Sequence, residues 1–141
     1  MDTKIVKYSS NLYSQLYAIL KKNYNSAISR EILEKYYTGD NKYIFLTVCE
    51  GNVLGCAFLE IKEDYIRPYK YGYISYVAVD ERYRKQGIGS GLIKYLISYA
   101  KEMSCSTVEL TSANYRVNAH AFYKTLGFEK KKTTVFIKEP I

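Results

Sequence analysis

The stretch Val79-Asp-Glu-Arg-Tyr-Arg-Lys-Gln-Gly-Ile-Gly-Ser-Gly91 connects an apolar, strand-like run to an amphipathic, helix-like run. Its glycines at positions 87, 89 and 91 remove the Cβ atoms that would keep a ligand away from the backbone. A helix that begins here directs unpaired N–H groups and the positive end of its dipole at whatever binds. The stretch therefore predicts a site for a phosphate-bearing ligand, most naturally a pyrophosphate.

Other nucleotide-binding loops use the same physics, but their residue patterns do not fit. The dinucleotide pattern G-x-G-x-x-G needs a glycine at position 92, where this chain has Leu92. No Lys-Ser or Lys-Thr pair closes the loop as a Walker sequence requires. The plain alternative is that the glycines only allow a strand to turn into a helix.

The segments on both sides of the glycines predict a strand–helix–strand unit. Tyr71–Val79 is interpreted as a strand buried on both faces, which places it at the centre of a sheet. The helix after the glycines has a stripe of apolar residues at helical spacing. They are Ile88, Leu92, Leu96 and Ala100, with Ile93 and Ile97 beside them. Residues 107–111 return as a strand, and a right-handed crossover makes the two strands parallel and adjacent.

The rest of the chain predicts further strands and helices. We expect a strand over residues 3–8, helices over 11–22 and 30–37, and strands over 42–50 and 53–62. Glu50-Gly51-Asn52 joins the last two strands as a hairpin turn. A final strand is expected over residues 133–138.

Between the return strand and the last strand the sequence predicts one more helix. Asn114 is expected to cap its start. Apolar residues follow at helical spacing, namely Ala119, Phe122, Tyr123 and Leu126. Gly127 with Phe128 predicts a left-handed cap at its end.

This helix carries a second motif, Arg116-Val-Asn-Ala-His-Ala-Phe-Tyr123-Lys-Thr-Leu-Gly127-Phe128. Together with Arg84-x-x-Gly87-x-Gly89 it resembles the GNAT superfamily of acyl-coenzyme A dependent N-acetyltransferases. Their signature is Q/R-x-x-G-x-G/A after the fourth strand, followed later by F/L-Y-x-x-x-G-F. The resemblance implies a mixed α/β fold. Its central, mostly antiparallel sheet contains a parallel, splayed pair of fourth and fifth strands and is flanked by helices.

The resemblance also implies a binding site for acetyl-coenzyme A as co-substrate. Backbone groups of Val77, Ala78 and Val79 would bond to the pantetheine arm. The pyrophosphate loop would comprise Arg84, Gln86, Gly87, Ile88, Gly89 and Ser90, and Lys85 would contact the ribose phosphate. Asn114, Arg116 and Tyr123 complete the implied site, and Arg116 stands where many members carry Asn.

The implied reaction moves the acetyl group to a primary amine of a small molecule or protein, by direct attack in a ternary complex. Tyr123 falls on the position that serves the departing thiolate, and the Val77 backbone N–H is our candidate donor for the oxyanion. The alternative reading is a non-catalytic protein that binds acetyl-coenzyme A or coenzyme A and regulates a partner.

The sequence does not identify the general base. Members often carry a carboxylate in the fourth strand, but Ser75 and Tyr76 occupy those positions here. Glu109 is the candidate base, with Glu60, His120 or a chain of waters as alternatives.

Composition favours one soluble domain. With 141 residues there is room for a single core, so we expect one N-acetyltransferase domain over residues 1–141. Three isolated cysteines and one histidine offer no metal-binding spacing, and we expect no metal. The apolar runs are too short for a membrane span, and the N-terminus lacks a secretory signal, which favours the cytoplasm.

The net charge of +7 raises the question of nucleic acid, but the basic residues are spread along the chain. The cluster at Arg82–Lys85 is explained by a ligand with several phosphates, so neither nucleic acid nor a membrane is expected as a partner. Relatives often pair through edge strands or the last strand, which makes a homodimer a hypothesis.

Overall fold

A computed structural model describes residues 1–141 and contains two compact units, Met1–Thr111 and Ser112–Ile141. The strands are β1 (Lys4–Lys7), β2 (Lys42–Cys49), β3 (Asn52–Asp64), β4 (Tyr69–Val79) and β5 (Thr107–Glu109). The helices are η1 (Ser10–Leu12), α1 (Tyr13–Tyr24), α2 (Arg30–Tyr37), η2 (Glu81–Tyr83), α3 (Ile88–Glu102) and α4 (Val117–Thr125). All of them except α4 belong to the first unit.

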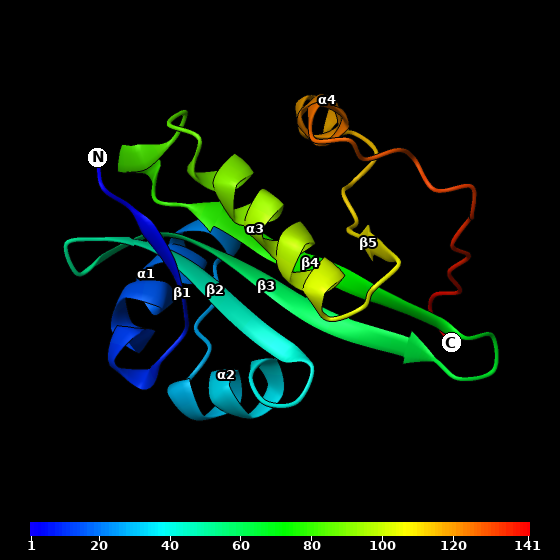
Figure 1. The fold of residues 1–141 in the computed structure, drawn as a ribbon, viewed down its shortest axis with the longest axis horizontal. Helices are drawn as coiled ribbons and strands as arrows, with labels where there is room; N and C mark the ends of the chain where they lie inside the picture. Colours follow the sequence, from blue (N-terminus) through cyan, green and yellow to red (C-terminus); the bar gives the residue numbers. More distant parts are fainter. The chain divides into compact units, whose positions relative to one another are not determined.

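The five strands form one sheet in the order β1-β2-β3-β4-β5 (Figure 1). The first four are antiparallel to their neighbours, and β4 and β5 are parallel. This confirms the mixed α/β fold with a parallel pair of fourth and fifth strands.

Helices cover both faces of the sheet in the first unit (Figure 1). On one face, Leu16 of α1 and Leu33 of α2 share a buried cluster with Leu46 of β2. Side chains alternate along a strand, so Phe45 lies on the other face, where its ring centroid is 5.0 Å from that of Tyr99 in α3. Each fully buried leucine or phenylalanine stabilises the fold by about 1.5–3 kcal/mol.

Two glycines allow α3 to lie close to the sheet. A Cβ atom on Gly55 would stand 3.0 Å from the Ala78 carbonyl oxygen and 3.1 Å from Ile88 Cγ2. One on Gly72 would stand 3.2 Å from Ala100 Cβ. Because Ile88 and Ala100 lie near opposite ends of α3, the helix rests on positions without side chains at both ends.

The predicted place of Tyr71–Val79 in the sheet was wrong. The middle strand is β3, which is buried without interruption from Val53 to Leu59. In β4 only Gly72, Ile74 and Ala78 are buried. The apolar appearance of β4 comes largely from tyrosines, whose rings pack while their hydroxyls make hydrogen bonds, as those of Tyr69 and Tyr73 do with Glu109 and Thr111.

The hairpin between β2 and β3 confirms the predicted turn. Cys49 pairs with Asn52, so Glu50 and Gly51 form a two-residue loop. Their φ angles are 49° and 79°, as a turn matched to the strand twist requires. The helix expected over 30–37 is α2, and the helix expected over 11–22 is η1 followed by α1.

In the second unit, α4 ends as predicted. Gly127 has a φ of 92°, its N–H bonds to the Lys124 carbonyl, and the Phe128 N–H bonds to the Tyr123 carbonyl at 3.1 Å. The rings of Tyr123 and Phe128 lie 6.0 Å apart, which supplies the hydrophobic contact of this cap.

Two other expectations for this unit were wrong. Arg116, not Asn114, precedes the first residue of α4, because a turn closed by the Arg116 N–H and the Ala113 carbonyl intervenes. Residues 133–138 form no strand, and Val135 and Phe136 are 91% and 90% exposed. Strand propensity needs a neighbouring strand, and the second unit contains none.

Candidate active site at the edge of β4

A β-bulge interrupts β4 at the predicted acyl site. Phe58 pairs with Ser75 and Cys56 pairs with Ala78, so Tyr76 and Val77 stand opposite one residue of β3. Tyr76 has a φ of 48°, which is uncommon for any residue other than glycine. Bulges redirect side chains, and such backbone strain is found mainly at functional sites. No signal in the sequence indicated this bulge.

The edge of β4 beyond the bulge faces away from β3. The pairing of β5 with β4 covers only Tyr71 to Tyr73. Asp80 donates its N–H to the Leu54 carbonyl on β3 at 2.8 Å. Backbone groups alternate in direction along an extended strand, so those of Val79 and Val77 point to the opposite side. Such an edge can bond to an extended ligand as if to another strand.

Two side chains already bond to carbonyl groups on this edge. The Tyr24 hydroxyl donates to the Val77 carbonyl at 3.1 Å, and Arg84 Nε donates to the Val79 carbonyl at 3.2 Å. Tyr24 is the last residue of α1, and Arg84 precedes the glycines. The edge therefore brings together the end of a helix and the start of the glycine turn.

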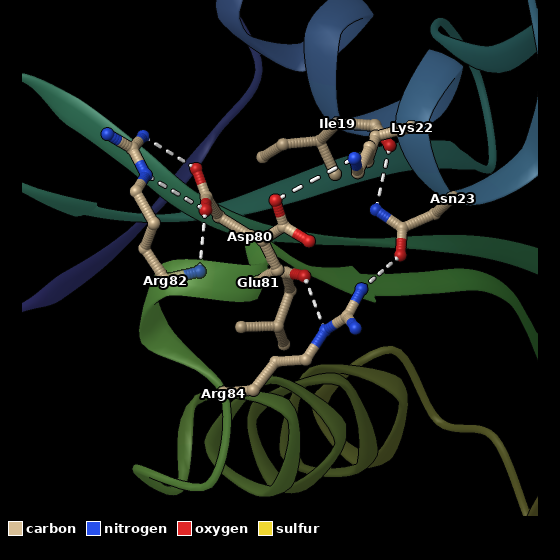
Figure 2. A network of polar contacts seen from close by, with 8 residues as sticks. Ile19, Lys22, Asn23, Asp80, Glu81, Arg82 and Arg84 are labelled. Carbon is tan, nitrogen blue, oxygen red and sulfur yellow. Dashed lines mark hydrogen bonds and ion pairs between the residues drawn. The ribbon is translucent and has the colours of Figure 1, made fainter.

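The neighbouring residues of α1 reinforce this link (Figure 2). Lys22 Nζ lies 3.7 Å from Glu81 Oε1, and Arg84 Nη2 donates to Asn23 Oδ1 at 2.8 Å. The Asn23 amide also donates to the Ile19 carbonyl at 2.8 Å, which orients its oxygen toward the guanidinium. These contacts of Lys22 and Asn23 with Glu81 and Arg84, which we call the latch, connect α1 to the turn. The sequence did not indicate this role of Arg84.

The glycine turn has the conformation that its sequence predicts. Gly87 precedes α3 with a φ of 81°, in the left-handed region that glycine adopts without strain. A Cβ atom on Gly91 would meet nothing within 4 Å, and one on Gly89 would meet only Val79 Cγ2 at 3.6 Å. Because the fold does not require glycine at 89 and 91, these positions leave room for a ligand at the start of α3.

A cavity of about 350 Å³ lies beside the first turn of α3. Ile5 and Thr47 line it together with Gln86, Gly87 and Ile88. Thr47 is only 3% exposed, and its hydroxyl oxygen has no hydrogen-bond partner within the protein. A water molecule in the cavity would satisfy this hydroxyl.

Four aromatic residues, which we call the tyrosine cluster, surround the bulge on the face covered by α1 and α2. They are Tyr24, Tyr37, Phe58 and Tyr76. The ring centroid of Tyr76 lies 5.2 Å from that of Tyr24, 5.4 Å from that of Phe58 and 6.2 Å from that of Tyr37. The Tyr37 hydroxyl and partial burial raise the pKa of Tyr76, so Tyr76 is a neutral phenol at neutral pH.

The structure brings one part of the predicted site together in the first unit. Val77, Ala78 and Val79 form the β4 edge, and residues 84–90 continue from it into α3. Glu109 is paired with Tyr73 and accepts a hydrogen bond from the Tyr69 hydroxyl at 3.4 Å. Its partner Tyr73 precedes Val77 by four residues on β4, so Glu109 lies roughly 13 Å from Val77 along the strand direction. Its role as the base stays a prediction.

The other predicted site residues, Asn114, Arg116 and Tyr123, belong to the second unit, and their roles also stay predictions. In that unit His120 Nε2 lies 2.9 Å from the Ala113 carbonyl oxygen, so its ring is engaged with the turn before α4. No group of three or more His, Cys, Asp and Glu side chains is arranged to hold a metal ion. None of the helices is long and apolar enough to cross a bilayer.

Comparison with known proteins agrees with this geometry. The model of the acetyltransferase (GNAT) family matches residues 12–128, and the chain belongs to this family. It is 31% identical over 115 residues to N-alpha-acetyltransferase 30 of Dictyostelium discoideum, covering 76% of this chain and 61% of that protein. The protein of the same name from Xenopus laevis is 28% identical over 137 residues, covering 92% of this chain and 47% of that one. The chain thus spans about half the length of these relatives.

Solved structures share the fold. The glucosamine-6-phosphate N-acetyltransferase of Arabidopsis thaliana superposes with a TM-score of 0.81 at 22% identity, covering 99% of both chains. An aminoglycoside acetyltransferase from an uncultured soil metagenomic sample superposes with a TM-score of 0.82 at 23% identity, covering 99% of this chain and 96% of that one.

Proposed function

We propose that this protein transfers the acetyl group of acetyl-coenzyme A to a primary amine within a ternary complex. The observation that carries the proposal is the continuity of the β4 edge with the glycine turn and the start of α3. A strand edge bonds to amide groups, and a helix start with an open glycine turn binds phosphate. Coenzyme A joins an amide-bearing arm to a pyrophosphate, so its two parts fit the two adjacent features.

The reaction needs a neutral amine, whose nitrogen attacks the thioester carbonyl while the carbonyl oxygen gains negative charge. The Val77 N–H is the proposed donor to that oxygen. The intermediate then collapses, the C–S bond breaks, and the thiolate takes a proton from the Tyr123 hydroxyl. The proton lost by the amine passes to water or, through water, to Glu109, and the Tyr123 phenolate regains a proton from water.

The α-amine of a polypeptide is the acceptor we favour, because two relatives that match at 31% and 28% identity carry the name N-alpha-acetyltransferase. The aminoglycoside and glucosamine-6-phosphate enzymes support the fold alone. Action as a single domain, a cytoplasmic location and pairing of two copies are further proposals that rest on the sequence.

Calorimetric titration with acetyl-coenzyme A, followed by an assay of thiol release with a panel of amines, tests the proposed function. We expect one-to-one binding and turnover with at least one amine. Tyr123→Phe should bind acetyl-coenzyme A normally and lose about 10²-fold or more in kcat, the size of a general-acid contribution. Binding without turnover on any amine would favour the regulatory alternative, which the lack of a carboxylate at Ser75 and Tyr76 motivates. Absence of binding would contradict both functions.

A further inference from the structure

The tyrosine cluster lies where an acceptor would approach the reacting carbon, provided that the proposed function is right. Tyr76 directly precedes Val77, whose N–H is the proposed oxyanion donor. Tyr24, at the end of α1, donates a hydrogen bond from its hydroxyl to the Val77 carbonyl at 3.1 Å. Any amine that attacks a thioester held on this edge from the face of α1 and α2 therefore passes beside these two rings.

The cluster presents an aromatic surface. Tyr24 and Tyr76 are 44% and 42% exposed, although both rings make edge-on contacts with their neighbours. Phe58, which is 4% exposed, forms the floor beneath Tyr76. Edge-on contacts with Tyr24, Tyr37 and Phe58 orient the Tyr76 ring. The surface is thus suited to an apolar side chain that seeks partial burial.

Three carboxylates on α2 and in the segment after β4 are already engaged. Glu34 of α2 accepts a hydrogen bond from the Tyr8 hydroxyl at 2.7 Å, and Glu81 lies 3.7 Å from Lys22. Asp80 is bound by Arg82 at 2.8 Å. The chain has a net charge of +7, which disfavours an acceptor with several cationic amines. The charge pattern favours an acceptor with a single amine.

We propose that the tyrosine cluster is the subsite for the first side chain of a polypeptide acceptor, and that it selects apolar first residues. The first side chain would lie against the rings of Tyr76 and Tyr24 while the α-amine faces the edge at Val77. The hydroxyls of Tyr37 and Tyr76 would bond to the first peptide group. This inference rests on the proposed function and adds its acceptor specificity.

The test compares peptides that differ only in their first residue, Leu or Ser, with spermidine as a polycationic acceptor. In the wild type we expect kcat/KM for the Leu peptide to exceed that for the Ser peptide by about 10- to 100-fold, the range of apolar pocket selectivity. Tyr76→Asn removes the ring at a position whose φ suits asparagine, so the fold is retained. It should reduce the ratio to below about 3-fold with unchanged affinity for acetyl-coenzyme A.

Two further variants isolate the ring. Tyr76→Phe keeps the ring and should keep the Leu preference. Tyr36→Ala removes an exposed tyrosine of α2 that lies outside the cluster and should leave the ratio unchanged. An equal ratio in wild type and Tyr76→Asn, or a higher kcat/KM for spermidine than for the Leu peptide, would overturn the subsite while leaving acetyl transfer intact. Turnover with no amine at all would overturn the proposed function as well.

Discussion

Gly55→Ala tests how closely α3 must lie on the sheet for the glycine turn to work. The new Cβ atom would stand 3.0 Å from the Ala78 carbonyl oxygen, a backbone atom that cannot rotate away, and 3.1 Å from Ile88 Cγ2. Such overpacking costs about 1–3 kcal/mol. Loss of glycine's freedom in the unfolded chain offsets about 0.5–1 kcal/mol of this. We expect a net loss of about 1–2 kcal/mol in the free energy of unfolding, or roughly 3–8 °C in Tm.

Urea denaturation measures this loss, and calorimetry measures its effect on the ligand site. Ile88 is the first residue of α3, so its displacement moves the N–H groups at the helix start and should weaken the binding of acetyl-coenzyme A. Gly72→Ala is the matched control, because it crowds Ala100 at the other end of α3 at 3.2 Å. It should lower stability without changing affinity. A Gly55→Ala protein within about 0.3 kcal/mol of the wild type, or one with unchanged affinity, would refute the reasoning.

Three other predictions concern the latch, the cavity and a buried thiol. Arg84→Ala and Asn23→Ala break the same bond, so the double variant should lose no more affinity for acetyl-coenzyme A in calorimetry than Arg84→Ala alone. Fully additive losses would instead show that the two side chains affect binding independently. Thr47→Val replaces an unpaired hydroxyl at constant shape and should raise the free energy of unfolding in urea by up to about 1 kcal/mol. A decrease would show that the hydroxyl has a bound partner. Burial raises the pKa of the Cys56 thiol to about 12, so iodoacetamide at pH 8 should label it only after unfolding, and rapid labelling of the native protein would contradict this.

Sequence patterns within a few residues predicted the helices and turns that are set by caps, apolar spacing and turn residues. The helix α2 begins after Ser29, whose hydroxyl accepts the Ile32 N–H, and its bounds follow from this cap and the apolar spacing. The turn at Glu50 and Gly51 and the cap at Gly127 follow from residues that tolerate positive φ. The strand, glycine turn and helix around Gly87 were predicted for the same reason, and their role as a phosphate site stays a prediction.

Features that depend on distant partners were not predictable in this way. The bulge at Tyr76 exists because β3 and β4 differ by one residue in register, and neither strand shows this alone. The contact between Asn23 and Arg84 joins residues 61 positions apart, and no periodicity reports it. The expected strand over residues 133–138 failed for the converse reason, since its β-branched residues describe a propensity that only a partner strand can satisfy.

The lack of a carboxylate on β4 influences which amines can react. Residues 69–79 include no carboxylate, and Tyr76 has a raised pKa, so β4 supplies no base near neutral pH. An α-amine has a pKa of about 7.7–8.0 and a lysine about 10.4, so at pH 7.5 roughly a third of α-amines but only about 0.1% of lysines are neutral. A site with a weak base therefore favours α-amines. We expect kcat/KM for a Leu-first peptide to rise from pH 6.5 and level off above about pH 8, and to exceed that of an N-blocked lysine peptide throughout. A preference for the lysine peptide at pH 7.5 would show that a strong base, such as Glu109 acting through water, is present after all.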